Sequence, residues 1–131
     1  VQSGFKGLFE TRKGDAFDVL ADLGQAGQKF DVVICDPPAF ASSKRSLDVG
    51  LRAYEKLARL ASLLVKEGGF LCLCSCSHAA DIAKFQTASV RGIGRAGRTA
   101  ALIHTGFAGP DHPQHSQLNE SGYLKSLFFR L

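Results

Sequence analysis

Residues 69–77 read GFLCLCSCS, and residues 30–38 read FDVVICDPP. Each stretch is a mostly apolar run that ends in polar residues or prolines, which is typical of a buried strand in a parallel sheet. Open α/β sheets place their chemistry just beyond the carboxyl ends of such strands. Cys76 and Asp36 stand at these two ends, so a thiol and a carboxylate are predicted to share one site.

The segments around these two strands alternate between helix and strand patterns. Residues 47–66 carry apolar side chains at helical spacing, and Gly68 and Gly69 are expected to end this helix. Weaker patterns predict two further helices, at residues 16–23 and 79–90, and three further strands, at residues 9–13, 99–105 and 123–131. This order predicts an α/β layer fold in a single domain, residues 1–131, with a mostly parallel sheet and a C-terminal antiparallel hairpin.

The composition is that of an ordinary globular protein. The 131 residues include 16 Lys and Arg against 12 Asp and Glu, a net charge of +4, which is compatible with an anionic partner. No apolar stretch approaches the roughly 20 residues that a membrane span needs. Residues 1–4 lack the basic and apolar regions of a signal peptide. We therefore expect a cytoplasmic protein without a membrane partner.

The four cysteines do not have the spacing of a metal site or a disulfide framework. Cys35, Cys72 and Cys74 lie inside strand-like runs, where a free cysteine behaves as a small buried hydrophobe. Zinc ligands would converge from turns at spacings such as C-x2-C, so no metal site is predicted. Cys76 differs from the others because it abuts serines and an expected helix start, a setting that favours a reactive thiol.

Residues 92–97 read GIGRAG and match the dinucleotide-binding pattern G-x-G-x-x-G. That motif binds phosphate only where it follows a strand and opens a helix, so that the helix N-terminus meets the phosphate. Here it follows an expected helix and precedes an expected strand. The glycines are therefore predicted to end the helix and form a flexible connection.

Several further motifs occur in the order found in one enzyme family. They are residues 14–17 (GDAF), 30–40 (FDVVICDPPAF), 44–54, 67–69 (EGG) leading into 75–77 (SCS), 111–113 (DHP) and 123–125 (YLK). On these motifs the chain resembles class I S-adenosylmethionine-dependent methyltransferases, and most of all the bacterial cytosine-5 methyltransferases of large-subunit ribosomal RNA. The resemblance implies a partial Rossmann-like methyltransferase fold, the C-terminal part of a catalytic domain that lacks the first strands.

The resemblance also implies a site for S-adenosylmethionine. Asp15, Ala16 and Phe17 match the segment that receives the adenine, and Asp36 with Pro37 matches the strand-end motif beside the cofactor. A carboxylate at position 15 can accept a hydrogen bond from the exocyclic amine of adenine. Asp15 can equally cap the helix that follows it, and the two roles are compatible.

The two strand-end residues match the catalytic groups of the family. Cys76 matches the nucleophile, whose thiolate adds to C6 of cytosine and makes C5 able to take up a methyl group. Asp36 matches the carboxylate that hydrogen-bonds or protonates a ring nitrogen of the base and draws electrons from C6. Each residue also has a purely structural alternative. Cys76 can be a packed cysteine at a strand end, and Asp36 can belong to an ordinary Asp-Pro turn.

Contacts to the RNA are expected from the loop after the first strand, from the long helix and from a late loop. The residues are Pro38, Phe40, Lys44, Arg52, Tyr54 and His112. Basic side chains can grip phosphates, and an aromatic ring can stack on a base. The alternative is that these are solvated surface residues, since charged loops and helix faces usually are.

The sequence departs from the family before residue 9, where no glycine-rich first cofactor motif and no RNA-binding domain are found. We therefore expect a catalytically silent fragment, with an exposed sheet edge near residues 9–13 that is loose or pairs with a second copy. Two other functions remain open. One is methylation of an amino group, guanine N2 or adenine N6, which needs no cysteine. The other is a non-catalytic RNA-binding module.

Overall fold

The computed structural model describes residues 4, 7–113, 115–117 and 123–131. The helices are α1 (Ala16–Gln25), the short 3-10 helix η1 (Lys44–Ser46), α2 (Leu47–Ser62) and α3 (Ile82–Arg95), and the strands are β1 (Phe30–Cys35), β2 (Val65–Ser75), β3 (Ala101–Phe107) and β4 (Lys125–Arg130). Helix and strand alternate up to β3, so the predicted α/β class is confirmed.

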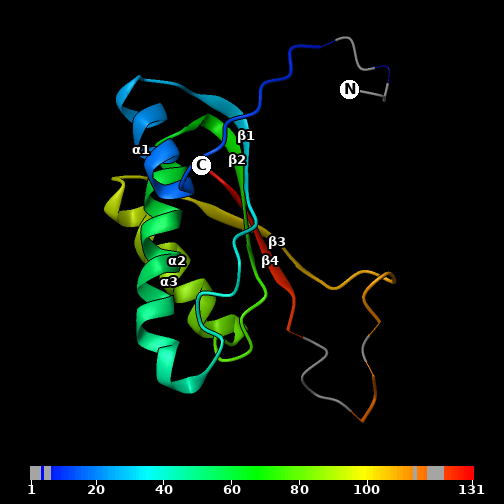
Figure 1. Cartoon of the computed structure of the whole chain (residues 1–131). Helices are drawn as coiled ribbons and strands as arrows, with labels where there is room; N and C mark the ends of the chain where they lie inside the picture. Colours follow the sequence, from blue (N-terminus) through cyan, green and yellow to red (C-terminus); the bar gives the residue numbers. More distant parts are fainter. Residues whose placement is uncertain (1–3, 5–6, 114, 118–122) are drawn as a thin grey trace.

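The four strands form one sheet in the order β1-β2-β4-β3. β1 and β2 are parallel, whereas β4 runs antiparallel to both of its neighbours, β2 and β3. The predicted C-terminal antiparallel pair is therefore confirmed, and its second strand inserts between β2 and β3. All three α-helices cover the same side of the sheet (Figure 1).

β1 has the predicted bounds, but β2 begins earlier than expected. Gly68 and Gly69 lie inside β2 and do not end a helix, which corrects the prediction. The β1–β2 register shifts between Phe30, which pairs with Val65, and Val32, which pairs with Phe70. The glycine pair falls within this irregularity, and Gly68 has φ +73°, a conformation that glycine adopts without strain.

α2 ends at Ser62, four residues before the predicted end. A contact from far along the chain meets this end of the helix. Arg98 donates hydrogen bonds from Nη1 to the carbonyl oxygens of Ser62 and Val65, at 2.9 and 2.7 Å. These bonds satisfy carbonyl groups where the helix gives way to β2, a position at which backbone groups lose their helical partners.

α3 runs to Arg95 and contains two of the three glycines of the G-x-G-x-x-G sequence. Gly92 packs against α2: a Cβ atom there would lie 2.3 Å from the carbonyl oxygen of Glu55 and 2.7 Å from Cβ of Ala58. Gly97, just beyond the helix, has φ +70°. The prediction that these glycines end the helix and form the connection therefore holds for Gly97 and is corrected for Gly92 and Gly94, which lie inside α3.

The two faces of the sheet are buried to different degrees. Leu71 and Leu73 of β2 and Leu127 and Phe129 of β4 point toward the helices and form the core. The alternate residues of the strands point to the other face, where large apolar side chains remain exposed: Val32, Ile34, Phe70 and Phe128. Figure 1 shows no helix over this second face.

Residues 9–13 form no strand, which corrects the sequence prediction. The segment is polar and extends away from the body of the molecule ahead of α1 (Figure 1). The strands left with an open edge are β1 and β3, at the two ends of the sheet. In the part of the chain that the structure describes, no helix is both long and apolar enough to cross a membrane.

Candidate active site at the strand ends

Cys76 and Asp36 come together as the sequence predicts. β1 and β2 are parallel neighbours, and Cys35 pairs with Leu73, so both strands end at the same edge of the sheet. The Sγ atom of Cys76 lies 3.9 Å from the carbonyl oxygen of Pro37. The thiol is partly exposed and the Asp36 carboxyl group is exposed, so both are open to a ligand at this edge.

The two serines that flank Cys76 are buried and hold its backbone. Ser77 Oγ accepts a hydrogen bond from the backbone amide of Ala41 at 3.0 Å and lies 2.6 Å from the hydroxyl of Tyr54. Ser75 Oγ donates to the same Tyr54 hydroxyl at 2.9 Å. The serines therefore fix the turn on both sides of the thiol, and only the residue between them faces outward.

A buried lysine completes this turn. Lys125, the first residue of β4, is 6% exposed, and its Nζ donates to the carbonyl oxygens of Ser77 at 2.9 Å and Tyr123 at 3.1 Å. Burial lowers the pKa of Lys125, and the nearby Asp81 and Cys76 oppose this shift. The motif at residues 123–125 includes this lysine, but the sequence predicted no role for it. The available signal was its place two residues ahead of the apolar run Leu127–Phe129.

The strand cysteines are electrostatically unlike a nucleophile. Burial raises the pKa of Cys35 to about 11, with a smaller contribution from Cys74. Burial, followed by the neighbouring Cys72, raises the pKa of Cys74 to about 12. Since the thiolate is the reactive form, these two thiols are inert at neutral pH. This agrees with their predicted place in the core, although Cys74 is only half-buried.

A cavity of about 310 Å³ opens beside Asp36. Ala16, Asp36 and Pro37, three of the five predicted cofactor residues, line it together with Arg12 and Gly14. Its other walls are apolar side chains from α1, β1 and α2: Val19, Leu20, Ile34, Cys35 and Leu57. A mostly apolar hollow with a carboxylate at its rim is the usual form of a small-molecule site.

The other two predicted cofactor residues flank this cavity. Asp15 caps α1: its Oδ1 accepts hydrogen bonds from the backbone amides of Phe17 and Asp18, at 2.9 and 3.2 Å. The helix-capping alternative is therefore confirmed. The Phe17 ring stacks on Phe40 with 5.9 Å between ring centroids, and the Lys56 ammonium lies 4.7 Å from its centroid. Phe17 thus supports the loop after β1.

Tyr54 does not lie where a base could stack on it. Its ring is 1% exposed and packs between Phe40 and Phe85, with centroid distances of 4.9 and 5.0 Å. This corrects the expectation of an RNA contact, because the hydroxyl already bonds to the two serines beside Cys76. Tyr54 instead holds the turn that carries Cys76.

The remaining predicted substrate residues are spread over the surface. Pro38 and Lys44 are exposed and Phe40 is half-buried, all on the segment that joins β1 to α2. His112 is exposed in the loop between β3 and β4, with Nδ1 3.2 Å from Asp111 Oδ2. This loop and the Cys76 turn leave the same edge of the sheet, because Ser75 and Phe107 both pair with Lys125.

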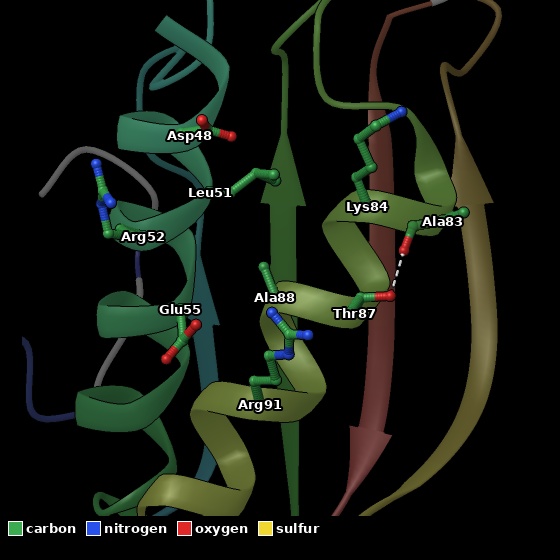
Figure 2. Close-up of a pocket in the computed structure, with 9 residues that line it drawn as sticks. All are labelled: Asp48, Leu51, Arg52, Glu55, Ala83, Lys84, Thr87, Ala88 and Arg91. Atoms are coloured by element: carbon green, nitrogen blue, oxygen red, sulfur yellow. Dashed lines mark hydrogen bonds between the residues drawn. The ribbon is translucent and has the colours of Figure 1, made fainter.

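Arg52 lies apart from this edge, on the helical layer. It borders a groove of about 400 Å³ between α2 and α3. Figure 2 shows its side chain directed away from α3, whereas Leu51 and Ala88 lie on the facing sides of the two helices. Among the described residues, no group of three or more His, Cys, Asp and Glu side chains could hold a metal ion.

Two curated relatives match almost the whole chain. One is a protein of Methanocaldococcus jannaschii that is provisionally named a ribosomal RNA large subunit methyltransferase, 38% identical over 123 residues, which are 94% of this chain and 31% of that protein. The other is the ribosomal RNA large subunit methyltransferase I of Vibrio vulnificus, 40% identical over 111 residues, which are 85% of this chain and 28% of that protein. The chain thus spans less than a third of each relative. No family model matches it.

Solved structures match the fold. A crystal structure of a provisionally named methyltransferase complexed with SAH superposes with a TM-score of 0.73 at 22% identity, covering 90% of this chain and 30% of that one. A provisionally named SAM-dependent methyltransferase from Streptococcus mutans gives 0.72 at 20% identity, with the same coverage. The sheet is part of a methyltransferase fold.

Proposed function

We propose that this chain is the C-terminal portion of a methyltransferase catalytic domain that transfers a methyl group from S-adenosylmethionine to C5 of a cytosine in large-subunit ribosomal RNA. The observation that carries the proposal is the placement of a partly exposed Cys76 thiol 3.9 Å from the Pro37 carbonyl oxygen, beside Asp36. The names of the sequence relatives support the ribosomal substrate.

The cavity beside Asp36 is the proposed place for the cofactor. Gly14, Ala16 and Pro37 would line it, and the Asp36 carboxylate would stand at its boundary with the substrate. The mostly apolar walls suit an adenine ring, and the SAH-bound structural neighbour supports this class of ligand. When bound, S-adenosylmethionine supplies an electrophilic methyl group.

Cys76 is the proposed nucleophile. Its thiolate forms a bond to C6 of the cytosine, and the electron pair released toward C5 forms the new bond to the methyl group. A base then removes the C5 proton, the C5–C6 double bond re-forms, and the thiolate leaves. Asp36 is proposed to hydrogen-bond a ring nitrogen of the base and so to draw electrons from C6.

The rim of the site is the proposed contact surface for RNA. Pro38, Phe40 and Lys44 lie on the segment after β1, and His112 lies in the loop after β3, which leaves the same edge of the sheet. Arg52 would contact RNA only where the substrate also reaches the helical layer. Basic groups there would position the phosphate backbone without reading its sequence.

The test is the formation of a covalent adduct with RNA that contains 5-azacytosine, which traps the enzyme after thiolate attack. The chain is assayed with labelled S-adenosylmethionine alongside a chimera in which it replaces the matching 111 residues of the Vibrio vulnificus relative. We expect the chimera, and not the isolated chain, to form an adduct that Cys76→Ala abolishes and Cys74→Ala preserves. Methylation of ordinary RNA that persists in Cys76→Ala, with no adduct, would instead indicate an amino-group target.

A further inference from the structure

Lys125 is a buried cation that the proposed mechanism does not use. It is 6% exposed and opens β4, where it pairs with Ser75 of β2 on one side and Phe107 of β3 on the other. Burying a lysine is costly unless its ammonium group is hydrogen-bonded or faces a negative charge. A lysine buried next to the Cys76 turn therefore needs a structural or functional explanation.

The hydrogen bonds of Lys125 join two segments of the site. The Ser77 carbonyl oxygen follows Cys76 directly, and the Tyr123 carbonyl oxygen ends the loop that contains His112. The ring of Tyr123 lies 4.6 Å from that of His78, which is also part of the Cys76 turn. One ammonium group thus connects the nucleophile to the loop between β3 and β4.

Four titratable groups lie on the elements that meet at the Cys76 turn. Asp36 follows β1, His78 follows Cys76 in the turn, Asp81 caps α3, and Lys125 opens β4. Two of them, Asp36 and Asp81, are carboxylates and disfavour a thiolate. Lys125 is the buried cation of this set, and its charge interacts with Cys76 through a medium that screens weakly.

We propose that Lys125 is a positioning residue for Cys76: its ammonium group fixes the Ser77 carbonyl oxygen and stabilises the Cys76 thiolate through space. The proposal rests on the proposed function, in which that thiolate is the nucleophile. Under this proposal Tyr54 and Lys125 have different roles. Tyr54 holds the turn through neutral hydrogen bonds, whereas Lys125 holds it and supplies charge.

The experiment measures the pH profile of Cys76 alkylation by iodoacetamide in the intact chain, with the four cysteines resolved by peptide mass spectrometry. Lys125→Met removes the charge and keeps the length of the side chain, Lys125→Arg keeps the charge, and Tyr54→Phe loosens the same turn without changing any charge. We expect the Lys125→Met profile to move to higher pH, with a tenfold loss of rate at neutral pH for each pH unit of movement. Lys125→Arg should restore most of the profile.

A purely structural role predicts something different. If the profile of Lys125→Met superposes on that of the wild type, or if Tyr54→Phe moves it equally, the charge of Lys125 has no part in stabilising the thiolate. Should Lys125→Met fail to fold, Lys125→Gln takes its place, because it removes the charge and keeps a donor for the Ser77 carbonyl oxygen. An unmoved Cys76 profile in Lys125→Gln then overturns the proposal.

The two proposals fail separately. An adduct that depends on Cys76, together with an unmoved profile in Lys125→Met, overturns the role of Lys125 and leaves the proposed function intact. A moved profile without any adduct supports the effect of Lys125 on the thiolate and overturns the role of Cys76 as nucleophile. Neither measurement needs the result of the other, because alkylation requires neither RNA nor cofactor.

Discussion

The two faces of the central sheet are built from alternate residues of the same strands, yet only one of them forms a core. In β4, Phe129 is 1% exposed beneath the helices, whereas its neighbour Phe128 is 36% exposed on the open face. In β2 the same contrast holds between Leu71 and Phe70. The apolar burial that stabilises the fold is therefore concentrated on the face that the helices cover. The candidate site lies at the edge of the sheet where β1 and β2 end.

The sharpest test of this contrast is a matched pair of truncations in β4. We expect Phe129→Ala to lower the free energy of unfolding by about 3–5 kcal/mol, because it removes a fully buried ring and leaves a cavity. Phe128→Ala should cost about 1 kcal/mol or less, since its ring is partly in solvent. Urea unfolding of both variants measures the difference, and equal losses would break the contrast between the faces.

A second pair extends the contrast to the helical layer behind the covered face. Gly92→Ala would place Cβ 2.3 Å from the Glu55 carbonyl oxygen, so α2 and α3 must separate at a cost of about 1–3 kcal/mol. Gly94→Ala meets no atom within 4 Å and should be neutral or gain up to about 1 kcal/mol from helix propensity. Thermal denaturation monitored by circular dichroism separates these outcomes. Similar behaviour of both variants would contradict the close packing at Gly92.

The polar contacts at the edge of the covered face should matter less than the core. Tyr54→Phe leaves the buried hydroxyls of Ser75 and Ser77 without their shared partner, and we expect a loss of about 1–2 kcal/mol in urea unfolding. Ser43→Ala, which removes an exposed capping hydroxyl near η1, serves as a control and should cost less. A larger loss in the control would show that the Tyr54 network does not hold the turn.

The smallest effect is expected at the exposed start of α3. Asp81 caps this helix and pairs with Lys84, contacts that lower the pKa of its carboxyl group. Asp81→Ala should cost about 1 kcal/mol at neutral pH. A lowered native pKa stabilises the fold above the unfolded value and loses this contribution as pH falls through the native pKa. The difference between variant and wild type should therefore shrink below about pH 4, and a difference that does not change with pH would contradict the ionic part of the cap.

Local sequence patterns predicted those elements whose ends are set by neighbouring residues in the chain. β1 has the expected bounds because an apolar run meets two prolines, and Cys76 stands at a strand end because the run before it is apolar. The end of α2 could not be read in the same way. The carbonyl groups there bond to Arg98, which lies 36 and 33 residues further along the chain, so no neighbouring residue signals their partner.

The residues of the candidate site show the same difference between what local patterns predict and what distant contacts decide. Cys76, Asp36 and Pro37 were predicted because the strand ends that carry them are adjacent in a parallel sheet. The role of Tyr54 was misjudged because helical spacing does not reveal that its hydroxyl bonds to Ser75 and Ser77. No role was predicted for Lys125 because its distant partner, the Ser77 carbonyl oxygen, lies in the turn after β2 and meets the lysine only when β4 enters the sheet.

The position of β4 has a consequence for the order of folding. β2 and β3 are separated in the sheet by a strand that comes after both in the chain, and β4 pairs with each of them. Until residues 125–130 arrive, β2 keeps an unpaired edge and the Cys76 turn lacks its lysine. Contacts between such distant segments slow folding. Among the described strands, the one that comes last in the sequence therefore fills the gap between β2 and β3 and also brings the lysine to the Cys76 turn, so the turn is complete only when the sheet is.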